Sequence, residues 1–140
     1  MTGLVVDASA LAEYLLGTPT GVGVAELMTD HAAEGLHLPH LAIVETASVL
    51  RGWHLSRQVE AARAAAALTD LADFPASRWP AEPLLARIWE LRDNLSAYDA
   101  TYVALAEELD AMLLTGDRRL ARGARSSARC PIRTVPASPQ

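Results

Sequence analysis

The sequence predicts an α/β fold in which a short parallel sheet is covered by helices on both faces. Short apolar runs of strand length alternate with longer, periodic, helix-forming segments, and this order is typical of a parallel sheet. An apolar fraction of 51% over 140 residues is enough for one domain with a core of its own. We therefore expect a single domain over residues 1–135 and a frayed tail over residues 136–140.

The first half of the chain predicts two strands and four helices. A strand at Leu4 to Val6 is stopped by Asp7, and Ser9 is placed to N-cap the helix that follows. Gly35 is suited to the position just after the second helix. The helices are expected over residues 10–16, 22–34, 40–52 and 56–71, and the strands over residues 4–6 and 36–39.

The second half continues the alternation. Pro75 lies in a weak strand, which favours an edge position, and Pro80 and Pro83 can open a fifth helix that ends near residue 93. Ser96 is a candidate N-cap of a sixth helix, and Asp99 completes a capping-box spacing. The expected strands are 73–79, 112–115 and 130–135, with a short helix over 117–121 between the last two.

Composition excludes several classes of protein. The chain has no lysine, whereas P-loop ATPases and Schiff-base enzymes need one. Its only cysteine, Cys130, cannot form an internal disulfide; we interpret it as an inert thiol and expect a cytoplasmic protein. No apolar run is long enough to span a membrane, and the N-terminus does not resemble a signal peptide.

Charge is distributed unevenly along the chain. Residues 1–117 carry all 17 acidic residues and six arginines, whereas residues 118–140 carry six arginines and no acid. An overall net charge of −5 argues against a protein that coats nucleic acid. The basic end could still clamp phosphates beside an acidic site, or it could be a solvated terminus with no role.

Four acidic residues lie where folding alone does not favour them: Asp7, Glu45, Asp99 and Asp117. Asp7 and Asp117 each follow a predicted buried strand, and ligands gather at the carboxyl ends of parallel strands. Glu45 and Asp99 lie near the starts of helices on the same side. Three of them have a simpler interpretation: Asp7 as an N-cap, Asp99 as a capping-box acid, Asp117 as a helix-terminal charge. As a set they favour one site.

The residue types at this site indicate a hard cation. Carboxylate oxygens suit Mg²⁺ or Mn²⁺, and the four histidines show no zinc-like spacing. One or two such cations would support phosphodiester hydrolysis. Ser9 and Thr115 lie two residues from Asp7 and Asp117, so their hydroxyls could orient a carboxylate; a helix cap and a strand end are the alternative roles.

Three segments resemble the PIN-domain family, and within it the VapC toxins of toxin–antitoxin pairs. They are VVDASAL, LAIVETASVLRG and LSAYDATYVALAEELDAMLLTGDRRL. They place Asp7, Glu45, Asp99 and Asp117 at the family's four acidic positions. Some relatives carry a further acid soon after the last aspartate, where this chain has RRLAR. Arg118 and Arg119 are therefore candidate contacts for RNA phosphates or antitoxin carboxylates.

The resemblance implies a three-layer α/β/α fold and a Mg²⁺- or Mn²⁺-dependent endoribonuclease. It implies Asp7, Asp99 and Asp117 as metal ligands, with Glu45 completing the catalytic set. It also implies a homodimer and a cognate, VapB-like antitoxin that blocks the active-site groove. The alternatives are an RNA-processing nuclease of the same fold and a PIN-fold binding module without activity.

Overall fold

The computed structural model describes residues 3–136 and contains one five-stranded, fully parallel sheet in the order β3-β2-β1-β4-β5. The strands are β1 (Leu4–Val6), β2 (Leu36–Pro39), β3 (Ser77–Trp79), β4 (Met112–Thr115) and β5 (Ile132–Thr134). All five predicted strands are present, so the α/β prediction is confirmed. Of the tail predicted to be frayed, residues 137–140 lie outside the described residues.

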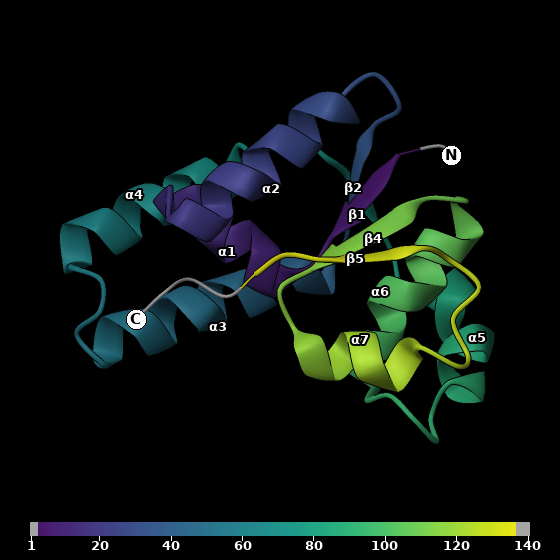
Figure 1. The fold of residues 1–140 in the computed structure, drawn as a ribbon. Coiled ribbons are helices and arrows are strands. Elements are labelled where there is room, and N and C mark those ends of the chain that lie inside the picture. Colours follow the sequence, from purple (N-terminus) through teal and green to yellow (C-terminus); the bar gives the residue numbers. More distant parts are fainter. Residues whose placement is uncertain (1–2, 137–140) are drawn as a thin grey trace.

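Helices cover both faces of the sheet (Figure 1). Those of the described residues are α1 (Ala8–Leu16), α2 (Pro19–Asp30), α3 (Leu41–Leu55), α4 (Ala61–Ala72), α5 (Leu85–Glu90), α6 (Ala97–Glu108) and α7 (Arg118–Ala124), with a 3-10 turn, η1 (Glu82–Leu84). In Figure 1, α1, α2 and α4 lie on one side of the sheet and α5, α6 and α7 on the other. The chain runs from β1 through β2 to β3 at one edge of the sheet and then returns through β4 to β5 at the other edge. Because crossovers between parallel strands are right-handed as a rule, crossovers in opposite directions place their helices on opposite faces.

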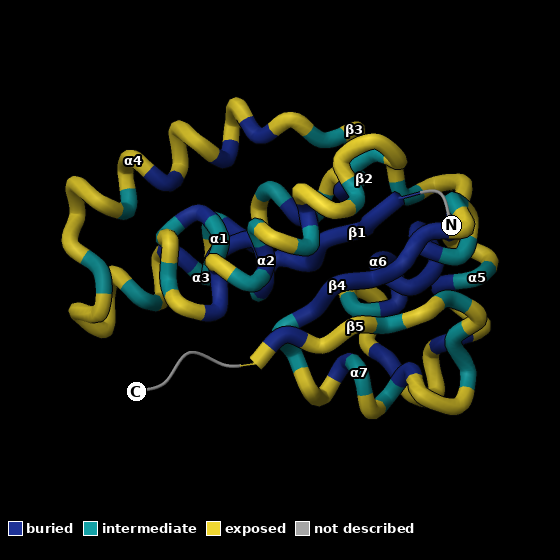
Figure 2. The backbone as a smooth tube through the Cα atoms, turned by 45° about the horizontal axis from the view of Figure 1, so that its top comes forward, coloured by how far each residue is buried: buried dark blue, intermediate teal, exposed yellow. Residues whose placement is uncertain are grey.

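The most deeply buried elements are the two central strands and α6 (Figure 2). All residues of β1 and β4 are buried, as are residues 100–106 of α6. The edge strands β3 and β5 are largely exposed, which confirms the edge position predicted from Pro75. No helix of the described residues is both long and apolar enough to cross a bilayer.

Strand order reverses between β1 and β4. β1 pairs with β2 on one side and with β4 on the other, and Val6 is in register with Leu114. The residues after these two strands therefore meet at the carboxyl edge of the sheet, where open α/β sheets leave a crevice. The backbone N–H of Asp7 donates to the Leu114 carbonyl at 3.0 Å, which brings the ends of both strands together.

Two helix starts differ from the prediction. Asp7, not Ser9, N-caps α1: its backbone is extended and its carboxylate accepts from the Ala10 N–H at 3.0 Å. The second helix begins at Pro19 instead of residue 22, because the Thr18 hydroxyl accepts from the Gly21 N–H at 3.0 Å and proline is well suited to the first helical position.

Other boundaries shift for local reasons. Gly35 does not follow the second helix, which ends at Asp30; its φ of 104° instead turns the chain into β2. The fourth helix begins at Ala61, because α3 extends to Leu55 and a turn must follow. The predicted fifth helix is η1 followed by α5, and the predicted helix over 117–121 runs from Arg118 to Ala124.

Candidate active site

Asp7 is held in place by three hydrogen bonds at the end of β1. Its Oδ1 accepts from the Ser9 hydroxyl at 2.7 Å and from the Ala10 N–H at 3.0 Å, and its Oδ2 accepts from the Thr115 hydroxyl. The residue is only 4% exposed. A buried aspartate with both oxygens engaged has a fixed orientation, so one edge of its carboxylate is presented to the crevice.

Asp117 occupies the matching position after β4. Its Oδ1 N-caps α7 by accepting from the backbone N–H groups of Arg119 and Leu120, at 2.8 and 3.2 Å. Its own N–H donates to the Thr115 hydroxyl at 2.9 Å. The sequence offered a choice between a helix charge and a site residue; the geometry makes Asp117 an N-cap whose side chain also lines the crevice.

Glu45 and Asp99 approach the crevice from α3 and α6. Glu45 is partly buried, and its Oε1 accepts from the Tyr102 hydroxyl at 2.6 Å. Asp99 lies in the first turn of α6, where its backbone N–H donates to the Ser96 hydroxyl at 3.1 Å. The N-cap predicted for Ser96 is thus confirmed, and the Asp99 side chain also reaches the crevice.

All four predicted acids line one cavity of about 360 Å³. The remaining lining residues are Ala8, Ser9, Ser48, Val49 and Tyr102. No arginine and none of the four histidines lines it. The structure therefore brings together the residues that the sequence singled out. Among residues 3–136, the ionisable groups that line the cavity are these four carboxylates and Tyr102.

Burial perturbs three of these carboxylates. Loss of solvent raises the pKa of Asp7, Glu45 and Asp99 above the ordinary range, and repulsion from neighbouring acids raises each of them further. Hydrogen bonds from Thr115 and Tyr102 offset part of the rise for Asp7 and Glu45. Clustered carboxylates with raised pKa values are typical of functional sites, and a bound cation would favour their ionised form.

The donor set fits a hard divalent cation. Carboxylates from the end of β1, from α3, from α6 and from the end of β4 line the cavity, and Mg²⁺ and Mn²⁺ prefer such ligands. Within residues 3–136, no three histidine, cysteine, aspartate or glutamate side chains form a ready-made metal group. Mg²⁺ commonly binds through one or two carboxylates and several waters, so it does not require three protein ligands already in place.

Ser9 and Thr115 both act on Asp7. The Ser9 hydroxyl donates to Asp7 and accepts from the Gly116 N–H at 3.0 Å, so it bridges α1 and the end of β4. Thr115 is fully buried and links Asp7 to the N–H of Asp117. The structure thus favours the orienting interpretation of both hydroxyls over the helix cap and the simple strand end.

Arg118 and Arg119, predicted as substrate or antitoxin contacts, are both exposed. Arg118 lines a neighbouring groove. Arg119 lines neither that groove nor the acidic cavity, but its charge partly offsets the raised pKa of Asp99. Their contacts with ligands stay predictions.

Sequence reasoning missed Tyr102. This residue lies one helical turn after Asp99, is 2% exposed and is hydrogen-bonded to Glu45. Within an alanine-rich helix it resembles an ordinary core aromatic residue. The one signal in the sequence is its position three residues after Asp99, which places both side chains on the same face of the helix. The Tyr102 hydroxyl interacts with the Ala8 backbone as well as with Glu45, and buried tyrosine hydroxyls usually have such partners.

Comparisons with known proteins place the chain in a family. The PIN domain family model matches residues 4–126. Ribonuclease VapC9 of Mycobacterium tuberculosis is 45% identical over 133 residues, which cover 95% of this chain and 98% of that protein. Ribonuclease VapC1 of the same organism is 38% identical over 136 residues, covering 96% and 99%.

Solved structures share the fold. The crystal structure of PAE2754 from Pyrobaculum aerophilum superposes with a TM-score of 0.62 at 25% identity, covering 94% of this chain and 83% of that one. Mycobacterium tuberculosis VapC20, described as a toxin that cleaves the sarcin-ricin loop, gives a TM-score of 0.64 at 16% identity, covering 98% and 100%. With four carboxylates converging at the carboxyl edge of its sheet, the chain belongs to the PIN-domain family, among the VapC ribonucleases.

Proposed function

We propose that this chain is a Mg²⁺- or Mn²⁺-dependent endoribonuclease, the toxin of a toxin–antitoxin pair, and that it hydrolyses RNA at the carboxylate cavity. The observation that carries the proposal is the convergence of Asp7, Glu45, Asp99 and Asp117 in one cavity at the edge of the sheet. The ribonuclease names of relatives that match nearly the whole chain support the same activity.

In this proposal, Asp7, Asp99 and Asp117 hold the cation. When bound, the cation supplies charge neutralisation and Lewis-acid activation for the reaction at phosphorus. Asp7 is the most rigid of the three, because Ser9 and Thr115 fix both of its oxygens. A carboxylate that is already oriented needs little reorganisation to bind, and this favours a well-defined geometry for the scissile phosphate.

We assign Glu45 the part of general base. Burial raises its pKa while the Tyr102 hydroxyl limits that rise, and a base whose pKa lies closer to neutrality transfers protons more effectively. Hydrolysis forms a bond between the oxygen of water and phosphorus and breaks one ester P–O bond. The proton lost by the water passes to Glu45, and the leaving oxygen takes a proton from solvent.

Substitution of Asp99 by asparagine tests this proposal directly. Asp99→Asn keeps the size and the backbone hydrogen bond to Ser96, but it removes one ligand charge. We expect RNA cleavage to fall by at least about a hundredfold, and EDTA to abolish cleavage by the wild type. Glu108→Gln is a matched control, because Glu108 is exposed at the far end of the same helix. Full activity of Asp99→Asn, or activity in EDTA, would refute the assignment.

A small VapB-like antitoxin and a second copy of this chain are the proposed partners. The large apolar side chains that are more than half exposed include Val44 at 73%, Trp89 at 67% and Tyr98 at 65%. Val44 and Tyr98 adjoin Glu45 and Asp99 in sequence, so a partner that covered them would lie beside the cavity. Light scattering of the purified chain checks for the dimer, and co-purification with the product of an adjacent small gene checks for the antitoxin.

We place the activity in the cytoplasm, where a ribonuclease toxin meets its RNA substrates. The proposal is supported by the similarity to VapC ribonucleases. Fractionation of cells that express a tagged Asp99→Asn variant tests it, and recovery of the protein outside the cytosolic fraction would contradict it.

A further inference from the structure

We propose that a groove between α7 and β5 binds the RNA phosphates that flank the scissile bond, through Arg118, Arg122 and Arg125. The inference rests on the proposed function, because it describes the path of the same substrate. It extends that function by adding a second, basic surface, which we call the arginine groove.

The arginine groove is about 740 Å³ in volume, twice that of the acidic cavity at about 360 Å³. One wall is formed by Arg118, Ala121 and Arg122 of α7 and by Arg125, the C-cap of that helix. The opposite wall is formed by residues 134–136. Figure 1 shows α7 directly alongside β5. Among residues 3–136, no acidic side chain lines the groove, so the charged side chains of its described lining are all arginines.

The three arginines are spaced to follow a phosphate backbone. They stand at positions i, i+4 and i+7 of α7, which places them on one face of the helix. At a rise of about 1.5 Å per residue, they span roughly 10 Å. Charges recur about every 3.4 Å of helix axis along one strand of a duplex, so arginines spread over this length can contact more than one phosphate. A guanidinium group can bind a phosphate through two parallel hydrogen bonds.

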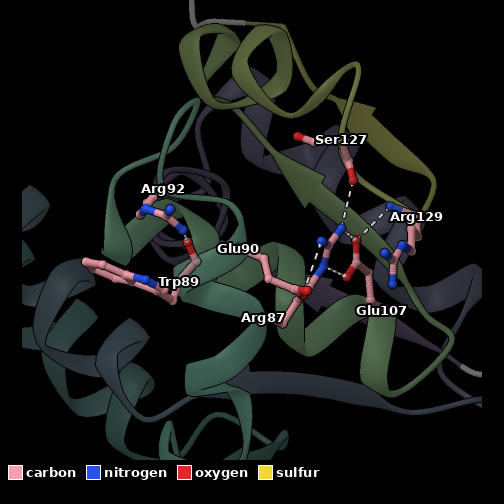
Figure 3. A network of polar contacts seen from close by, with 7 residues as sticks. All are labelled: Arg87, Trp89, Glu90, Arg92, Glu107, Ser127 and Arg129. Carbon is pink, nitrogen blue, oxygen red and sulfur yellow. Dashed lines mark hydrogen bonds and ion pairs between the residues drawn. The ribbon is translucent and has the colours of Figure 1, made fainter.

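These arginines keep their charge available. In the described part of the chain, the only ion pairs are those of Arg87 with Glu90 and Glu107. Figure 3 shows this network. Arg87 donates two hydrogen bonds to the Glu107 carboxylate, at 2.7 and 3.1 Å, and a third to the Ser127 carbonyl. Glu107 also accepts from the Arg129 N–H at 2.7 Å. Glu107, the acid that holds the connection between α7 and β5, is thus already paired with Arg87 and not with an arginine of the groove.

The arginine groove lies next to the acidic cavity. Asp117 lines the cavity and the next residue, Arg118, lines the groove. Gly116 lies between the cavity and the groove. A Cβ placed on it would lie 3.2 Å from the Ser9 hydroxyl, which lines the cavity, and 3.6 Å from Val135, which lines the groove. Because clustered carboxylates repel phosphate, an RNA strand needs cationic contacts outside the cavity. The arginine groove supplies such contacts, and its first arginine, Arg118, directly follows Asp117 of the cavity.

A charge-neutral double variant tests the inference. We would measure binding of fluorescein-labelled oligouridine to wild type and to Arg122→Gln/Arg125→Gln by anisotropy, over a salt series in EDTA. We expect the slope of log affinity against log salt to become about 1.4 less steep, at about 0.7 for each lost phosphate contact. The matched control is Arg92→Gln/Arg129→Gln, which removes the same charge from exposed side chains outside the groove.

Further variants protect the test against misfolding. Arg122→Lys/Arg125→Lys should keep the wild-type slope because it keeps both charges. The single glutamine variants should each change the slope by about 0.7. An unchanged slope in folded variants overturns the inference. A second outcome would also overturn it: the variants keep the wild-type salt slope for RNA but no longer bind a poly-glutamate peptide. That result would make the groove a docking site for protein.

The two hypotheses fail separately. The salt slopes are measured in EDTA and do not require cleavage, whereas the proposed function fails if wild type leaves RNA intact with Mg²⁺ or Mn²⁺. If wild type cleaves RNA, we also expect Arg122→Gln/Arg125→Gln to raise KM about tenfold at little cost in kcat, because these arginines bind the flanks of the substrate. A fall in kcat alone would contradict the inference.

Discussion

The hydroxyl of Thr115 at the end of β4 donates a hydrogen bond to the carboxylate of Asp7 at the end of β1. The same hydroxyl oxygen accepts from the N–H of Asp117 at 2.9 Å. One buried side chain therefore connects the acids that follow the two central strands. Because the sheet register fixes Thr115 beside the end of β1, the orientation of Asp7 follows from the fold itself.

Replacement of Thr115 by valine, which has nearly the same shape, should damage both stability and activity. Without the hydroxyl, the buried Asp7 oxygen and the Asp117 N–H lose a partner. We expect the free energy of unfolding to fall by about 1–3 kcal/mol and RNA cleavage to fall with it. Urea denaturation and a cleavage assay measure the two effects.

Thr69→Val provides the control for this substitution. The Thr69 hydroxyl bonds only to the Ala65 carbonyl on the exposed side of α4, so its loss should change stability by less than about 0.5 kcal/mol. Equal effects of the two substitutions would mean that the bond to Asp7 contributes nothing specific.

The strand ends could be predicted from sequence because short apolar runs stopped by an acid are a local signal. Asp7 and Asp117 were found in this way. The start of the first helix was not predicted correctly, because Ser9 and Asp7 are both good N-caps. The choice between them depends on a long-range hydrogen bond: the Ser9 hydroxyl accepts from the Gly116 N–H at the end of β4. Local sequence carries no information about such a partner.

The arginine groove was beyond prediction for a related reason. The surplus of arginine after residue 117 was evident, but Arg118 and Arg119 attracted attention as the neighbours of Asp117. The helical phase of α7 and its packing against β5 decide which arginines line the arginine groove. The structure assigns Arg122 and Arg125 to the groove and leaves Arg119 outside it.

Stability without metal should fall as pH rises above the ordinary carboxyl range. Burial raises the pKa of Asp7, Glu45 and Asp99 above their ordinary values of 3.8 and 4.5. Between those values and the raised ones, the folded state binds more protons than the unfolded state, so the free energy of unfolding decreases with increasing pH. Thermal melts in EDTA from pH 4 upward should show the decrease.

Asp99→Asn and excess Mg²⁺ should each weaken this pH dependence, the first by removing a titrating group and the second by stabilising the ionised acids. At a cation concentration of ten times Kd, we expect a gain of about 1.4 kcal/mol in the wild type and a smaller gain in the variant. If stability in EDTA rises steadily from pH 4 to 7, the carboxylates do not repel one another as the cavity implies.

The Tyr102 hydroxyl should set the pH range of activity through Glu45. Its hydrogen bond lowers the pKa of Glu45, so Tyr102→Phe should raise that pKa further. If Glu45 acts as a base, it must be ionised, and the acid limb of kcat/KM against pH should then move to higher pH. Tyr98→Phe on the same helix is the control, because Tyr98 is largely exposed. An acid limb that stays in place in Tyr102→Phe would remove Glu45 from the role of base.

Gly116→Ala should disturb the site without unfolding the protein. An added Cβ would lie 3.2 Å from the Ser9 hydroxyl, so that side chain must move by a few tenths of an ångström. Its bonds to Asp7 and to the Gly116 N–H would both lengthen. We expect stability to fall by about 1 kcal/mol and cleavage to fall by more than that change explains. Gly23→Ala, where a Cβ meets nothing within 4 Å, should be neutral or stabilising. Equal activity of the two variants would show that the orientation of Asp7 does not depend on Ser9.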